Sequence, residues 1–119
     1  MAPGELERKV DLAFLADFYG ALLTENQQRI LSLYCGEDLS LAEIAEETGI
    51  SRQAVHESLT RASAKLYEME AALGVASRFR RMEAGLKEAL SALHKGEYDR
   101  AGRLLEALQA LDQEENHGL

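Results

Sequence analysis

One stretch of the chain decides the fold: Leu41-Ala42-Glu43-Ile44-Ala45-Glu46-Glu47-Thr48-Gly49-Ile50-Ser51-Arg52-Gln53-Ala54-Val55. Its pattern is that of two helices joined by a sharp turn. The first helix is short, with Ile44 facing inward and Ala45 small enough for the helices to cross. Gly49 suits a left-handed turn, and Ser51 suits the N-cap of the second helix. The stretch therefore predicts a helix-turn-helix.

On both sides of this motif the apolar residues recur at helical spacing, and nothing alternates as a strand would. Capping boxes at Thr24–Gln27 and Ser40–Glu43 mark two helix starts. We therefore expect an all-α fold, with a helix-turn-helix domain over residues 1–75 and a C-terminal αα-hairpin with a frayed tail over residues 76–119. The expected helices cover about residues 6–23, 24–36, 40–48, 51–73, 77–94 and 99–112.

Three of these helices have an apolar side that can be read from the spacing. The first carries Leu6, Val10, Phe14 or Leu15, Phe18 and Leu22, and the fifth carries Phe79, Met82, Leu86, Leu90 and Leu93. The long fourth helix carries a heptad-like seam from Val55 to Leu73. The first helix and this seam offer more apolar surface than a small domain needs, so we expect a homodimer through one of them.

The net charge of the 119 residues is −8, but it is unevenly spread. Residues 1–51 carry three basic and ten acidic side chains, and residues 82–119 carry four and eight. Residues 52–81, in contrast, carry six basic and three acidic side chains. The total disfavours indiscriminate binding to polyanions, whereas the central stretch leaves room for a local contact with phosphates.

Arginine and glutamine at the start of the second helix of the motif are typical of groups that read nucleic acids. The acidic residues on the helix before it would repel a phosphate backbone there. The same surface could therefore bind a protein or RNA instead of DNA. The candidate binding residues are Ser51, Arg52, Gln53, His56, Thr60, Arg61, Lys65, Arg78, Arg80 and Arg81.

No residues point to catalysis, to a metal or to a cofactor. The three histidines are far apart in sequence, the single cysteine cannot form an internal disulfide, and no phosphate loop or nucleophile motif occurs. No apolar run approaches about 18 residues, so we expect no membrane insertion. The N-terminal residues lack the pattern of a secretory signal, which makes the cytoplasm the expected location.

Segments before and within the motif resemble the YlxM family of small bacterial proteins, which are similar to the fourth region of sigma-70-type sigma factors. The resemblance is carried by Asp17–Gln27, Glu37–Glu46 and Ser51–Val55, and it covers about residues 14–73. It implies a partner and not a reaction: family members are linked to the signal recognition particle, whose protein or RNA they are described as binding. The likeness to sigma factors implies DNA binding as the competing function.

Three hypotheses follow. The chain is an adaptor of the signal recognition particle, a sequence-specific DNA-binding regulator, or a protein interaction module without nucleic-acid binding. In the third case the basic stretch only pairs with the acidic first half of the chain.

Overall fold

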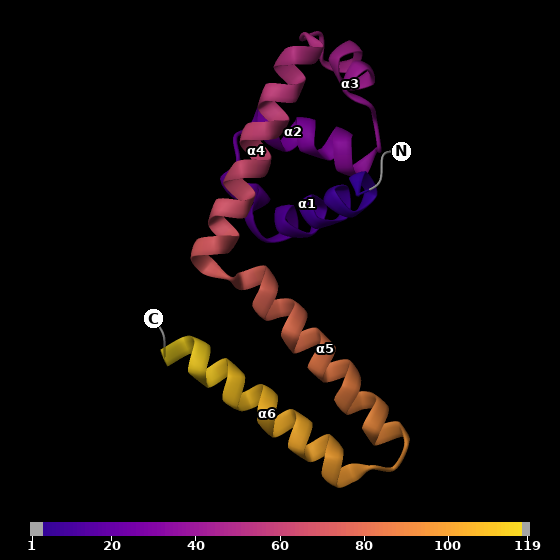
Figure 1. Ribbon diagram of the computed structural model, residues 1–119, viewed down its shortest axis with the longest axis vertical. Helices are drawn as coiled ribbons and strands as arrows, with labels where there is room; N and C mark the ends of the chain where they lie inside the picture. Colours follow the sequence, from indigo (N-terminus) through magenta and orange to yellow (C-terminus); the bar gives the residue numbers. More distant parts are fainter. Residues whose placement is uncertain (1–3, 118–119) are drawn as a thin grey trace. The chain divides into compact units, whose positions relative to one another are not determined.

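The computed structural model describes residues 4–117, and within that range the chain forms six α-helices and no strand (Figure 1). The prediction of an all-α fold is confirmed. A 3₁₀ turn, Gly20–Leu22, follows the first helix, and a π-helical turn, Ser32–Gly36, follows the second. Two compact units result, the first ending at Ala76 and the second beginning at Ser77. The helices are α1 Glu5–Tyr19, α2 Glu25–Leu31, α3 Leu41–Thr48, α4 Arg52–Leu73, α5 Val75–His94 and α6 Tyr98–His117.

The helix starts of the first unit are set by local hydrogen bonds. In the capping box of α3, Glu43 N donates to Ser40 Oγ at 3.1 Å, and Ser40 N donates to Glu43 Oε1 at 3.0 Å. Thr24 and Gln27 form the matching box of α2. α3 ends at Gly49, whose φ of 75° is the left-handed conformation expected from the sequence. These local bonds set where α2 and α3 begin and where α3 ends.

The core of the first unit forms where α4 packs against α1, α2 and α3 (Figure 1). Val55, Leu59 and Leu66 of α4 are buried there together with Ala62. The heptad-like seam is therefore used within the unit, and only its end at Leu73 is exposed. This is a correction, because we expected the seam to offer surface for a second copy.

The buried face of α1 also differs from the expected one. Leu6, Val10 and Leu22 are 61%, 57% and 63% exposed. The side chains that point into the core are instead Lys9, Leu12, Leu15 and Tyr19. The prediction was right for Leu15, which is buried, and for Phe14 and Phe18, which pack against the core. It was wrong for Leu6, Val10 and Leu22, and it missed Lys9 because it counted only apolar residues, whereas a lysine can bury its aliphatic stem.

Lys9 holds α1 against the loop that leads into α3. Its Nζ donates a 2.6 Å hydrogen bond to Asp38 Oδ1 and lies 4.4 Å from the ring centroid of Tyr34. Asp38 has a φ of 55°, which a non-glycine residue adopts only with support from its surroundings. The hydrogen bond to Asp38 raises the pKa of Lys9, although burial of the amine opposes the rise.

Tyr19 makes a second tie, at the other end of α1. Its hydroxyl donates to Glu70 Oε1 at 2.6 Å and accepts from Val75 N at 3.1 Å. The same Glu70 oxygen accepts from Ala76 N at 3.0 Å. Burial, and then the bond to Glu70, raise the pKa of Tyr19. The network joins α1 to the end of α4 and satisfies the first backbone donors of α5.

In the second unit, α5 and α6 contact each other through small residues. Ala89, Ala92 and Ala101 are buried, and a Cβ added at Gly85 would overlap the side chain of Leu108. The row predicted as the apolar side of α5 is instead about half exposed, from Phe79 at 45% to Leu90 at 52%. The five residues share one side of α5, as their spacing indicates, and within the described residues that side is only partly covered.

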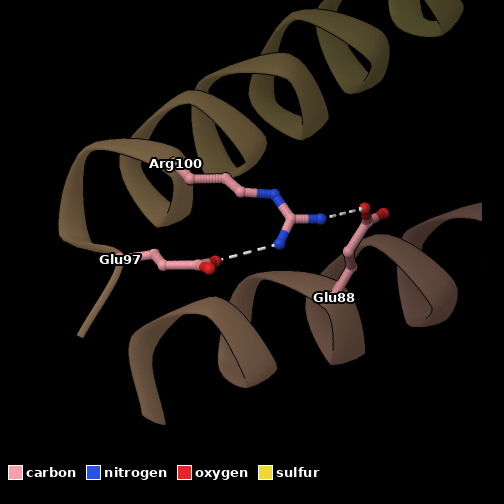
Figure 2. A network of polar contacts seen from close by, with 3 residues as sticks. All are labelled: Glu88, Glu97 and Arg100. Atoms are coloured by element: carbon pink, nitrogen blue, oxygen red, sulfur yellow. Dashed lines mark hydrogen bonds and ion pairs between the residues drawn. The ribbon is translucent and has the colours of Figure 1, made fainter. Parts of the chain in front are cut away.

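Charged residues tie the two helices of the hairpin together near the turn. The two terminal nitrogens of Arg100 each donate a 3.0 Å bond, one to Glu97 and one to Glu88 of α5 (Figure 2). α6 continues past residue 112, where the sequence places its end, to His117. Of the tail that we expect to fray, residues 118 and 119 lie outside the described residues.

Replacing Asp38 and replacing Lys9 should lower the free energy of unfolding by different amounts. Asp38→Asn leaves a buried ammonium without its carboxylate and should lower the free energy of unfolding by about 2–3 kcal/mol. Lys9→Met leaves only a carboxylate whose side chain is 66% exposed, so it should cost less, about 1 kcal/mol. Urea unfolding measures both values.

The matched control is Lys87→Met, which removes an exposed pair with Glu83 and should change stability by less than about 0.5 kcal/mol. Because the folded pKa of Lys9 is raised, its contribution is complete below pH 10.5 and is lost as the pH rises through the folded pKa. The difference in the free energy of unfolding between the wild type and Asp38→Asn should therefore become smaller in strong alkali. Equal losses for Lys9→Met and Lys87→Met would show that the tie does not stabilise the fold.

Candidate functional site

The outward face of α4 carries most of the predicted binding residues. Arg52, Gln53, His56, Thr60, Arg61 and Lys65 are all exposed, and they lie on one continuous helix. We call these six residues the α4 surface. α4 is held by buried residues on its opposite side, so the α4 surface is presented from a rigid support.

Ser51 belongs to the turn and not to this surface. Its Oγ accepts a 3.0 Å hydrogen bond from Ala54 N, which caps α4. The Ser51 hydroxyl was predicted to bind a partner, whereas in the structure it accepts this capping hydrogen bond.

The α4 surface borders a cavity on each flank. On one flank, Arg52, His56 and Thr60 line a cavity of about 370 Å³. On the other flank, Arg61 lines a cavity of about 510 Å³ together with Glu57. Arg52, His56 and Thr60 thus line one cavity and Arg61 lines the other.

The cations of the α4 surface are available for an external anion. Arg52, Arg61 and Lys65 form no ion pair with any residue in the range 4–117. Arginine and lysine in this state bind phosphates well, arginine through two parallel hydrogen bonds and lysine as a point charge.

The three remaining predicted residues, Arg78, Arg80 and Arg81, lie on α5 in the second unit. Each of them already has interactions with other residues of the chain. They therefore belong to the second compact unit, whereas the α4 surface belongs to the first.

α3 presents acidic side chains next to the motif. Glu43, Glu46 and Glu47 are exposed and line one shallow cavity with Leu39. The hydrogen bond from the Ser40 backbone, and then that from its side chain, lower the pKa of Glu43. α3 is therefore anionic at neutral pH, which disfavours a phosphate backbone lying across it.

Arg8 was missed by the sequence analysis. It is exposed, belongs to α1, and lines the same cavity as Arg52 and His56. No spacing rule connects residue 8 to residue 52. The available signal was indirect, because a buried Lys9 turns its neighbour Arg8 outward beside the loop before α3.

Other kinds of site have no support in the described part of the chain. No three His, Cys, Asp or Glu side chains among its residues are grouped as metal ligands would be. None of its helices is long and apolar enough to cross a membrane.

Comparison with known proteins places the whole arrangement in a family. Residues 6–103 match the family model UPF0122, described as "Putative helix-turn-helix protein, YlxM / p13 like". A UPF0122 protein of Symbiobacterium thermophilum is 48% identical over 99 residues, which are 83% of this chain and 92% of that protein. One of Halalkalibacterium halodurans is 38% identical over 108 residues, 90% of this chain and 99% of that protein.

The family match extends past the residues on which the resemblance was first seen, through α5 and into α6. The hairpin is therefore part of the shared pattern and not an unrelated addition. The helix-turn-helix and the hairpin together show that this chain belongs to the UPF0122 family of YlxM / p13-like helix-turn-helix proteins.

Proposed function

We propose that this chain is a non-enzymatic adaptor of the bacterial signal recognition particle pathway, acting in the cytoplasm and binding the particle's RNA through the α4 surface. The link to the particle comes from the resemblance to the YlxM family. The observation that carries the choice of ligand is the set of exposed cations on α4, Arg52, Arg61 and Lys65, which lack acidic partners within residues 4–117.

The acidic α3 favours RNA over duplex DNA. In DNA-bound helix-turn-helix proteins the helix before the recognition helix crosses the phosphate backbone. Glu43, Glu46 and Glu47 of α3 are exposed, so a duplex docked in this way would meet three carboxylates. RNA is recognised mainly at loops, bulges and ends, which can reach α4 without lying along α3.

The DNA-binding alternative retains one supporting observation. Arg52 and Gln53 are exposed in the first turn of α4, where major-groove readers stand in other helix-turn-helix proteins. The other alternative is a protein interaction module that binds no nucleic acid, whereas an adaptor could also contact the particle's GTPase. Both alternatives are outcomes of the experiment below.

The proposal predicts how RNA affinity depends on salt. Each phosphate contact that is removed lowers the slope of log K against log salt concentration by about 1. The triple variant Arg52→Ala/Arg61→Ala/Lys65→Ala should therefore lose about 3 in slope and bind the particle's RNA weakly at low salt. Fluorescence anisotropy with labelled RNA over a salt series measures this.

The control is Arg29→Ala, which removes an exposed arginine on α2 and leaves the α4 surface intact. It should reduce the slope by less than 1. If the two variants behave alike, α4 is not the binding surface. Tighter binding to one duplex DNA sequence, lost in Arg52→Ala, supports the regulator instead. Loss of binding to every nucleic acid at physiological salt supports the protein module.

We also propose that the chain forms a homodimer, and that the uncovered apolar row of the hairpin is the contact. Phe79, Leu86, Leu90, Leu93 and Leu105 are each about half exposed and lie on two helices of one unit. Two copies of this face can pack as a four-helix bundle through a self-complementary contact. On each copy, burying the exposed half of one such side chain contributes about 1 kcal/mol to the free energy of dimerisation.

Light scattering at tens of micromolar should give the mass of a dimer for the wild type and of a monomer for Leu86→Glu/Leu90→Glu. The matched variant Leu6→Glu/Val10→Glu places the same charges on the exposed row of α1 and should remain dimeric. If Leu86→Glu/Leu90→Glu is a dimer and Leu6→Glu/Val10→Glu is a monomer, the contact lies on α1 instead. A monomeric wild type would refute dimerisation.

A further inference from the structure

The cavity beside the first turns of α4 combines elements that are distant in sequence. Its volume is about 370 Å³. α1, the π-helical turn, the start of α3 and α4 all contribute to its walls. The lining residues are Glu5, Arg8, Tyr34, Ser40, Leu41, Ala42, Arg52, His56, Leu59 and Thr60.

Two guanidinium groups border this cavity from different helices. Arg8 on α1 and Arg52 on α4 are both exposed, and neither forms an ion pair with a residue in the described range. A pair of planar forks around one opening suits a phosphate group, which accepts parallel hydrogen bonds from arginine. His56 and Thr60 add hydrogen-bonding groups along the same wall.

Besides these polar groups and those of Glu5 and Ser40, the lining has an apolar part. Leu59 and Tyr34 are buried at 6% and 8% exposure, and Leu41 lies beside them in the cavity wall. The volume falls within the range of about 300–1,000 Å³ that holds small organic ligands, so it exceeds the need of a bare phosphate. An anion that also carries a flat or apolar body fits both parts of the lining.

We infer that this cavity binds a single nucleotide unit, with its phosphate between Arg8 and Arg52 and its nucleoside against Leu41 and Leu59. The inference rests on the proposed function in one respect: RNA presents such units where a nucleotide is unstacked at a bulge or loop. A free nucleotide shares the chemistry, and the experiment separates the two sources.

Glu5 is the one acidic side chain in this lining, and it interacts with other residues of the chain. Its charge disfavours an anion at the opening. Glu5→Gln should therefore tighten binding of the nucleotide, whereas a non-specific surface contact would not respond to this one position more than to Glu25, which is exposed on α2.

The test follows the backbone and side-chain NMR signals of the full chain during titration at low salt. The probes are inorganic phosphate, adenosine and uridine 5′-monophosphates, a fully paired RNA hairpin, and the same hairpin with one bulged nucleotide. The monophosphates should shift the signals of Arg8, Arg52 and His56 and bind more tightly than phosphate. The bulged hairpin should bind about tenfold more tightly than the paired one, as expected for hydrogen bonds to a charged group.

Arg8→Ala should abolish this tenfold preference, and Arg8→Lys should restore only part of it because an ammonium cannot form the paired bonds. Arg29→Ala should retain the preference. An unchanged NMR spectrum away from the cavity shows that each variant is folded.

The outcomes separate this inference from the proposed function. If the chain binds RNA but Arg8→Ala and Arg29→Ala behave alike, the cavity site is wrong and binding through α4 stands. If the monophosphates shift the cavity signals while neither RNA binds, the cavity takes free nucleotides and the proposed function is wrong. If phosphate and the monophosphates bind with equal affinity, the inference that the nucleoside lies against Leu41 and Leu59 is wrong.

Discussion

The geometry of the first unit depends on one buried cation. Lys9 is 7% exposed and is held between Asp38 and the ring of Tyr34. Asp38 stands in a left-handed conformation just before the capping box of α3, so the ammonium fixes the loop at the point where the helix-turn-helix begins. The same contact fixes the rotation of α1, and with it the position of Arg8 at the cavity. This ion pair thus supports both the start of the motif and one wall of the candidate site.

Local signals made the helix boundaries predictable. The boxes at Thr24 and Ser40, the cap at Ser51 and the glycines at 49 and 74 act within a few residues, so their bonds can be inferred from spacing alone. Each of them satisfies backbone groups that any helix end leaves open. The exposed face of α4 was predictable for the same reason, since its inward residues follow one continuous period.

The predictions that failed were those that depended on which other element a helix packs against. The inward face of α1 includes Lys9, whose carboxylate partner Asp38 lies 29 positions away in sequence. Counting apolar residues cannot detect such a pair. The hairpin buries Ala89 and Ala92, leaves Leu90 and Leu93 half exposed, and places Gly85 against the side chain of Leu108. Arg8 joined the site for a tertiary reason as well. Periodicity indicates that a helix has two faces, and only the fold shows which one is covered.

The tie between Tyr19 and Glu70 has a consequence for the order in which the chain can fold. The two residues are 51 positions apart, whereas the caps of α2, α3 and α4 close over three positions. At a synthesis rate of about 5–20 residues per second, Glu70 is added to the chain roughly 3–10 s after Tyr19. During that interval α1 has the π-helical turn Ser32–Gly36 as a native partner, but the side that packs against α4 is uncovered. The contact of α1 with α4 thus forms later in synthesis than its contact with the π-helical turn, and that side of α1 is exposed to wrong contacts for as long as α4 is incomplete.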